Sequence, residues 1–128
     1  MNIHEHQAKQ ILKKYGVPVP EGIFALTVDE LIEKAKSWKT EKCVLKAQIH
    51  AGGRGAGYFK NSFNKKGGVQ VIQDKTKVSD IAKSMLGNIL ITKQTGKQGK
   101  KVNRLFIEEG CEIEKEFFLS LLIDRNNS

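Results

Sequence analysis

The chain passes from an apolar strand into a glycine-rich loop at Lys46-Ala-Gln-Ile-His50-Ala-Gly52-Gly53-Arg54-Gly55-Ala-Gly57. A lysine inside an apolar strand is costly unless an anion or a carboxylate meets its ammonium group. Glycines allow backbone N–H groups to close around phosphate oxygens. The stretch therefore predicts half of a phosphate-binding site.

Alternation along residues 43–49 indicates which way the lysine faces. Cys43, Leu45, Ala47 and Ile49 share one apolar face, and Lys46 shares the other with Val44, Gln48 and His50. This second face is a polar stripe that leads into the loop. Two readings of Lys46 remain open, namely a lysine paired with a carboxylate at the edge of the core and a cation that binds phosphate.

The glycine loop matches neither of the common phosphate-loop motifs. Gly52 and Gly57 have the Walker A separation, but Tyr58-Phe59 stands where that motif needs Lys-Ser/Thr. A dinucleotide-binding fingerprint is excluded because a strand-like segment follows the loop where that motif needs a helix. Residues 58–66 are polar and predict a protruding loop.

Hydrophobic periodicity predicts an α/β domain built as α+β layers. Apolar residues recur at helical spacing within 8–15, 31–38 and 78–86. Asn2 with Glu5, and Thr27 with Glu30, predict capping boxes at two helix starts. Strands are predicted at 23–26, 43–49, 69–72, 88–92, 104–108 and 116–123, the last two as antiparallel neighbours.

Composition is that of an ordinary globular domain with a basic surface. The chain has 128 residues and a net charge of +8, enough for one domain with a real core. The basic groups at 65–66, 97 and 100–101 lie in predicted loops without interleaved aromatics. Positive charge permits nucleic-acid binding, but this pattern favours a solvated basic surface, with attraction of a small anion as a further alternative.

Other features exclude several classes of protein. No apolar run reaches the ~18 residues of a membrane span, and the beginning of the chain has neither signal nor transit character, so we expect a cytoplasmic protein. Cys43 and Cys111 are both predicted to be reduced core thiols. No Cys/His spacing predicts a zinc site.

Two glutamates frame the connector between the last predicted strands. Glu108 ends one strand and Glu116 begins the next. A strand end with its connector can supply backbone groups to a nucleotide base and a carboxylate to ribose hydroxyls. Solvated strand-end charges are the alternative, because Glu109, Glu112 and Glu114 show that acidity alone is not diagnostic.

Three segments, residues 1–18, 46–55 and 102–125, together resemble the β subunits of succinate–CoA ligases, which are ATP-grasp enzymes. The resemblance implies the N-terminal part of an ATP-grasp fold, a mixed sheet with flanking helices. It implies a first subdomain at 1–101, which contains the phosphate loop 50–57 and the protruding loop 58–66. Residues 102–128 would be strands that begin a second, truncated subdomain.

The resemblance also implies roles for individual residues. Lys46 would contact the phosphates of ATP or GTP, and Gly53, Arg54 and Gly55 would form the phosphate-side loop. Glu108 and Cys111 would lie at the base and hinge, Cys111 through its backbone, and Glu116 would hold the ribose. The Mg²⁺ ligands are expected beyond residue 128, and no catalytic residue is assigned within this chain.

A ligase of this family works with an α subunit. It couples ATP or GTP to the interconversion of succinate plus CoA and succinyl-CoA in the citric acid cycle, through a phosphohistidine on the α subunit. The alternatives are another ATP-grasp acyl-CoA ligase, such as malate–CoA ligase, and a basic nucleic-acid-binding module. Nucleic acid is the less expected partner.

The sequence departs from the family's pattern in two places. Residues 56–66 intervene before Gly67-Gly68, which lengthens the loop, and the chain stops at Ser128. Phosphoryl transfer depends on positioning and on charge neutralisation by Mg²⁺. We therefore expect this chain to be inactive on its own.

Overall fold

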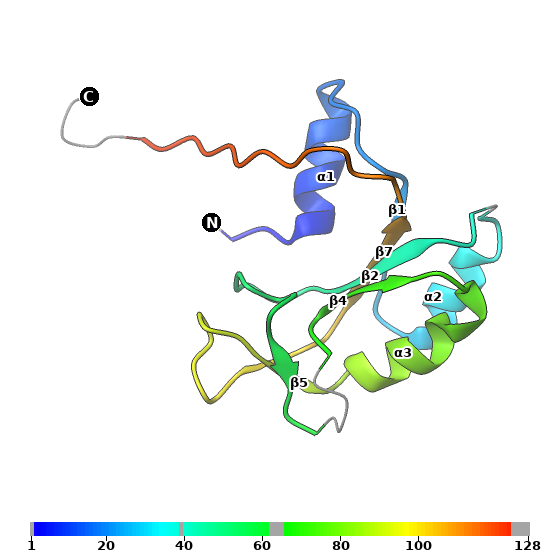
Figure 1. Ribbon diagram of the computed structural model, residues 1–128, viewed down its shortest axis with the longest axis vertical. Coiled ribbons are helices and arrows are strands. Elements are labelled where there is room, and N and C mark those ends of the chain that lie inside the picture. Colours follow the sequence, from blue (N-terminus) through cyan, green and yellow to red (C-terminus); the bar gives the residue numbers. More distant parts are fainter. Residues whose placement is uncertain (1, 39, 62–65, 124–128) are drawn as a thin grey trace.

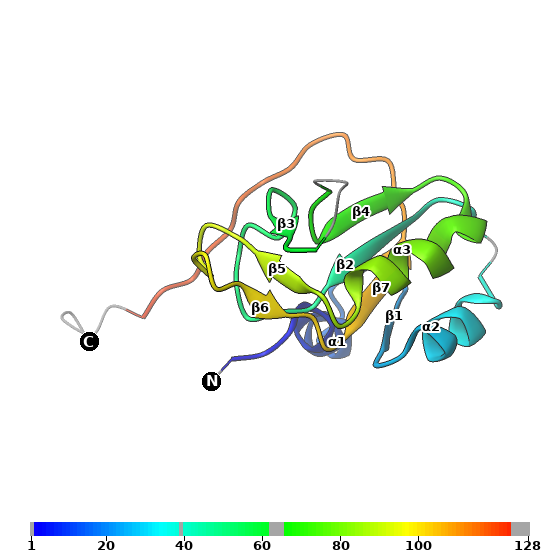
Figure 2. The ribbon, with the colours of Figure 1, turned by 90° about the horizontal axis from the view of Figure 1, so that it is seen from below.

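The computed structural model describes residues 2–38, 40–61 and 66–123. They form layers, with one helix on one face of a four-stranded sheet and two helices on the other (Figure 1). A three-stranded sheet lies beside these layers (Figure 2). This is the layered α/β architecture that the sequence predicts.

Helices and strands alternate at the beginning of the chain, and runs of consecutive strands follow the second and third helices. The helices are α1 (Glu5–Lys14), α2 (Val28–Ala35) and α3 (Val78–Met85), with a short 3-10 helix, η1 (Lys75–Lys77), before α3. The larger sheet contains, in spatial order, β1 (Gly22–Ala25), β7 (Leu105–Glu109), β2 (Cys43–Ala47) and β4 (Val69–Ile72). The smaller sheet contains β3 (Tyr58–Phe59), β5 (Ile89–Ile91) and β6 (Lys100–Lys101).

The larger sheet is antiparallel throughout its described pairs, in place of the expected mixed sheet. β1 and β2 are joined through α2 and run in the same direction, since both are antiparallel to β7. They are not neighbours, because β7 lies between them. A helical crossover normally joins adjacent parallel strands, so the insertion of a distant strand removes the parallel pair that the connection favours.

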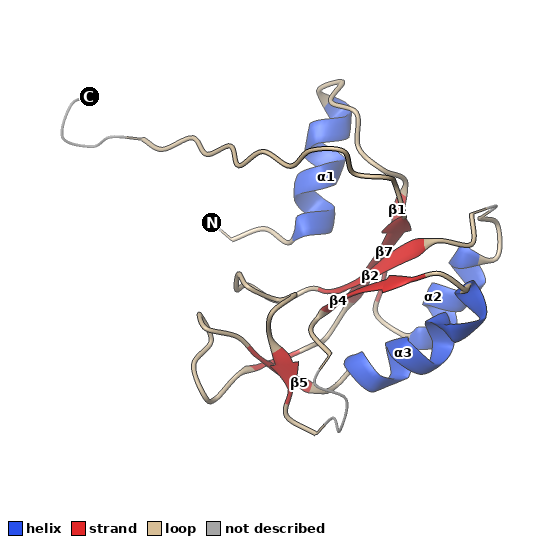
Figure 3. Cartoon of the chain, viewed as in Figure 1, coloured by secondary structure: helices blue, strands red, loops and turns tan. Residues whose placement is uncertain are grey.

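Strand alternation places the core on one side of the sheet, as predicted. Cys43, Leu45 and Ala47 on β2 are buried in one core cluster with Leu31 of α2 and Met85 of α3. Figure 3 shows these two helices on one face of the sheet. Burial of these apolar side chains is the main favourable contribution to folding. The opposite face of β2 carries Lys46 toward α1.

The two predicted helix starts differ in outcome. Thr27 caps α2, and its Oγ1 accepts a hydrogen bond from the Glu30 N–H at 3.1 Å, as predicted. The prediction for α1 is wrong, because the N-cap is His4, whose N–H donates to Gln7 Oε1 at 2.8 Å. Glu5 does not cap the helix, since its carboxylate contacts side chains from β2 and the glycine loop.

Part of the predicted protruding loop is a strand. Tyr58 and Phe59 pair with β5, and Phe59 is buried in the core. The polarity of the segment as a whole concealed this one inward-facing aromatic residue. Residues 62–65 of the predicted loop lie outside the described residues.

The strand predicted at 116–123 is wrong. The described residues after β7 form no helix or strand, and their large apolar side chains are 87–94% exposed from Phe117 to Ile123. An apolar strand is stable only when a partner covers it, and no described strand pairs with this segment. The predicted boundary at 101/102 stays a prediction, and β7, which follows it, pairs with β1 and β2, which precede it.

The two cysteines differ in burial. Cys43 is buried and Cys111 is exposed, and neither forms a disulfide. Burial raises the pKa of the Cys43 thiol, which keeps it in the unreactive protonated form. The prediction of a core thiol is confirmed for Cys43 and is wrong for Cys111.

Candidate functional site

The candidate site lies where β2 leads into the glycine loop. The loop is closed by its own backbone, because the Arg54 carbonyl accepts hydrogen bonds from the Gly57 N–H at 3.2 Å and the Gly68 N–H at 2.7 Å. Gly53 adopts a φ of 70°, a conformation that a glycine adopts without strain. This closure turns the Arg54 side chain back toward β2, where its Nη1 donates to the Ala47 carbonyl at 2.7 Å.

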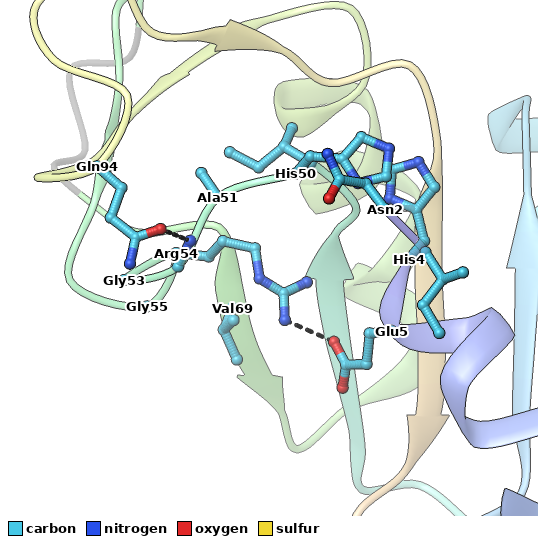
Figure 4. A pocket seen from close by; sticks show the side chains of 13 residues that line it. Asn2, His4, Glu5, His50, Ala51, Gly53, Arg54, Gly55, Val69 and Gln94 are labelled. Atoms are coloured by element: carbon cyan, nitrogen blue, oxygen red, sulfur yellow. Dashed lines mark hydrogen bonds and ion pairs between the residues drawn. The ribbon is translucent and has the colours of Figure 1, made fainter. Parts of the chain in front are cut away.

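Two cations from different elements converge on one carboxylate. Lys46 Nζ donates to Glu5 Oε1 at 2.9 Å, and Arg54 Nη2 donates to Glu5 Oε2 at 2.6 Å. Figure 4 shows the Arg54 guanidinium and the Glu5 carboxylate facing each other across the site. The Lys46 side chain is only 16% exposed. The strand, the loop and α1 thus meet at a single charged cluster.

A second carboxylate approaches Lys46 from β7. The antiparallel register places Glu108 opposite Val44 and Phe106 opposite Lys46, so Glu108 lies on the face that carries Lys46. Glu108 is 5% exposed, and its carboxylate contacts the ammonium groups of both Lys46 and Lys9. A buried carboxylate is tolerated when it is paired in this way.

The charges of the cluster hold each other ionised. Burial disfavours the ionised form of Glu5, but hydrogen bonds from Lys46 and Arg54 outweigh it and lower the pKa of Glu5 to about 2. Burial also disfavours the charged form of Lys46, and hydrogen bonds to Glu108 and Glu5 outweigh it and raise the pKa of Lys46. Lys46 is therefore a permanent cation at neutral pH.

A pocket of about 740 Å³ opens beside this cluster (Figure 4). Its wall combines the start of α1, the residues that follow β2 into the glycine loop, and the first residue of β4. Gln94 fixes the far side of the loop, because its Oε1 accepts a hydrogen bond from the Gly52 N–H at 2.6 Å. The lining residues are Asn2, Ile3, His4, Glu5, Ile49, His50, Ala51, Gly52, Gly53, Arg54, Gly55, Val69 and Gln94.

The structure brings together some of the residues predicted from sequence. Gly53, Arg54 and Gly55 line the pocket, and Lys46 and Glu108 belong to the charged cluster at its edge. Cys111 and Glu116 are exposed and do not line this pocket. The role of each residue in binding a nucleotide stays a prediction.

Sequence reasoning missed the contribution of α1. Glu5 and Lys9 are four residues apart and therefore share one face of the helix, and both contact the cluster. That spacing is the signal in the sequence that Glu5 and Lys9 face the same neighbour, but Glu5 also fits the capping-box pattern. Both open readings of Lys46 survive, since it pairs with carboxylates and also lies beside the pocket.

The pocket suits a phosphate chain better than it suits a metal. Lys46 and Arg54 are charged donors, and a Cβ added at Gly53 would meet no atom within 4 Å, so the backbone there is open to a ligand. Among residues 2–38, 40–61 and 66–123 no cluster of three or more His, Cys, Asp or Glu could hold a metal ion. No described helix is long and apolar enough to cross a membrane.

Replacing Gly67 with alanine is expected to displace the glycine loop. A Cβ at Gly67 would overlap the Gly55 carbonyl and come within 2.8 Å of the Arg54 carbonyl oxygen. Both are backbone atoms, so the loop must shift, and overpacking of this kind typically costs ~1–3 kcal/mol. Denaturant unfolding should show this loss for Gly67→Ala. Lys66→Ala, at the preceding exposed position, should leave stability unchanged, and equal stabilities would contradict the prediction.

Acid is expected to destabilise the chain through His4 as well as through its carboxylates. Burial, followed by the positive charges of His50, Arg104, His6 and Arg54, lowers the pKa of His4 from 6.5 to about 4. Between these two pKa values the unfolded chain therefore binds a proton at His4 that the folded chain does not bind. The free energy of unfolding consequently falls as the pH falls from 6.5 to 4. His4→Asn keeps a good N-cap and should flatten the dependence in this range, measured by urea midpoints. If the urea midpoint of His4→Asn depended on pH as steeply as that of the parent, the role of His4 would be refuted.

Comparison with known proteins shows which protein family the chain belongs to. The ATP-grasp domain family matches residues 2–128. The chain belongs to this family, which agrees with the layered α/β fold and with a glycine loop beside buried cations. ATP-grasp domains bind nucleotides, and the site described above lies in such a domain.

Similar proteins narrow the class further. The chain is 62% identical, over its whole length, to the β subunit of an ADP-forming succinate–CoA ligase from Pelagibacter ubique. Identity is 53% over its whole length to the subunit of the same name from Geobacillus thermodenitrificans, and 54% over 98% of its length to that from Paramagnetospirillum magneticum. The chain spans 31% of the length of each of these relatives.

Proposed function

We propose that this chain is the nucleotide-binding, N-terminal part of a succinate–CoA ligase β subunit. The names of the relatives, which are ADP-forming enzymes, support an adenine nucleotide over GTP. With an α subunit, the complete enzyme would couple ATP to the interconversion of succinate plus CoA and succinyl-CoA. A cytoplasmic enzyme of the citric acid cycle is part of the same proposal.

One observation carries the proposal beyond family membership. Lys46 and Arg54 come from a strand and a loop, yet both donate to one carboxylate at the edge of the pocket. Two charged donors that converge on one anionic group can equally hold phosphate oxygens. Lys46 would act as a point charge on the phosphates, and Arg54 would add planar donors.

The remaining roles follow the same logic. Gly53 and Gly55 would allow the loop backbone to approach the phosphates closely. Glu108 and the backbone of Cys111 would lie toward the base, and Glu116 would reach the ribose hydroxyls. Mg²⁺, when bound with ATP, would neutralise charge on the phosphates. We propose no protein ligand for Mg²⁺ among the described residues, where no cluster of three or more His, Cys, Asp or Glu could hold a metal ion.

The proposal is tested by calorimetric titration of the chain with Mg-ATP, Mg-GTP and a DNA oligonucleotide at near-physiological salt. Saturable ATP binding that exceeds GTP binding is expected. Binding that is equal for all three polyanions and falls steeply with salt would instead indicate a nonspecific basic surface.

A further inference from the structure

α1 is attached to the sheet through the side chains proposed to bind the nucleotide. His6 is the one residue within α1 that is buried, and its ring stacks on that of Phe24 in β1 with the ring centroids 4.6 Å apart. Ion pairs of other α1 side chains add to this attachment. Glu5 pairs with Lys46 and Arg54, and Lys9 contacts Glu108. The helix lies on the face of the sheet opposite to α2 and α3 (Figure 1).

Each of the two cations at the site already directs a donor at Glu5. An ammonium group has three N–H donors, and Lys46 directs two of its contacts to Glu5 and Glu108. Arg54 uses Nη2 on Glu5 and Nη1 on the Ala47 carbonyl. A phosphate group that reaches both cations therefore either uses their remaining N–H donors and lies beside the Glu5 carboxylate, or replaces the contacts of Glu5.

The charge of Glu5 acts in the same direction. Its pKa of about 2 keeps it ionised at any pH at which the chain would be assayed. An ionised carboxylate repels a phosphate placed on the same cations, and this repulsion is strong where the side chains are largely withdrawn from water. Glu5 thus opposes phosphate binding by geometry and by charge.

We infer that Glu5 competes with the phosphate chain of the nucleotide for Lys46 and Arg54, and that phosphate binding releases the start of α1 from the sheet. The inference rests on the proposed nucleotide site and adds a residue that sets its affinity. It makes α1 an internal competitor whose carboxylate occupies the place of a phosphate.

The first test compares the parent chain, Glu5→Gln and Glu33→Gln. Gln keeps the shape of Glu5 and one acceptor oxygen but removes its charge. Titration with inorganic pyrophosphate and with ATP should show at least ~10-fold tighter binding by Glu5→Gln. Glu33→Gln removes an exposed carboxylate that pairs only with Lys36 among the described residues, and its affinities should equal those of the parent. Equal, weaker or undetectable binding by Glu5→Gln, with a circular dichroism spectrum that shows the variant folded, would overturn the inference.

A second measurement uses the parent chain alone. Amide hydrogen exchange in 5–14 should accelerate when pyrophosphate saturates the site, because the ion pairs of Glu5 are lost. Unchanged or slower exchange would overturn the inference even if Glu5→Gln failed to fold. The proposed nucleotide site fails on a different result, namely ATP binding that the loss of the Lys46 charge leaves unchanged.

Discussion

Lys46→Ala is expected to weaken ATP binding ~100-fold while the chain remains folded. A charge-assisted hydrogen bond contributes ~1.5–3 kcal/mol, and each ~1.4 kcal/mol is a factor of ten in affinity. Lys46 is largely buried beside the pocket and its pKa is raised, so its full charge would act on the phosphates with little screening by water. Calorimetric titration of parent and variant with Mg-ATP measures the effect.

The fold should survive because each carboxylate of the cluster keeps another cation. Glu5 retains Arg54, and Glu108 retains Lys9. Removing a sole partner would leave a buried charge unpaired and would be strongly destabilising, but neither carboxylate is left in that position. A circular dichroism spectrum and an unfolding midpoint close to those of the parent would confirm that lost binding is not lost structure.

Lys13→Ala is the matched control for charge. Lys13 lies on α1 and pairs with Glu21 at 2.6 Å, with both side chains exposed. The variant loses the same unit of charge without touching the site, so ATP affinity should stay within about twofold. If Lys13→Ala and Lys46→Ala weakened binding equally, net charge would govern affinity and the specific site would be refuted.

Much of the site could be predicted because it depends on local sequence. Alternation on β2 separates Leu45 from Lys46 and assigns one to the core and the other to the polar face, as the structure shows. The glycine loop and its arginine are adjacent in the chain, so their proximity needs no knowledge of the fold. The strand at 69–72 was also predicted with its observed bounds.

The missing parts depend on contacts between segments far apart in the sequence. The approach of Glu108 to Lys46 follows from the register of β7 against β2, and a shift of one residue would turn Glu108 to the other face. The approach of Glu5 follows from the docking of α1. Neither register nor docking can be read from a local pattern, and the local pattern at Glu5 favours a capping box instead.

Among the substitutions considered for this chain, Leu45→Ala is expected to lower the free energy of unfolding most. Leu45 is 0% exposed in the middle of β2, where its side chain packs in the core beneath the sheet. Truncation of a buried leucine to alanine removes apolar groups that folding had taken out of water, and it leaves a cavity. The two effects together cost ~2–5 kcal/mol. Small domains are stable by only ~5–15 kcal/mol. Guanidinium unfolding should therefore show a large fall in midpoint with an unchanged slope.

Val71→Ala provides the comparison for Leu45→Ala. Val71 lies on the neighbouring strand β4 but is 58% exposed, so its truncation should change stability by no more than ~0.5 kcal/mol. Equal effects at the two positions would show that strand propensity, and not burial, governs this sheet. Leu45 and Lys46 are adjacent, yet we expect one truncation to affect folding and the other to affect binding. Successive side chains on a strand point to opposite faces, and this alternation lets one five-residue strand support both the core and the site.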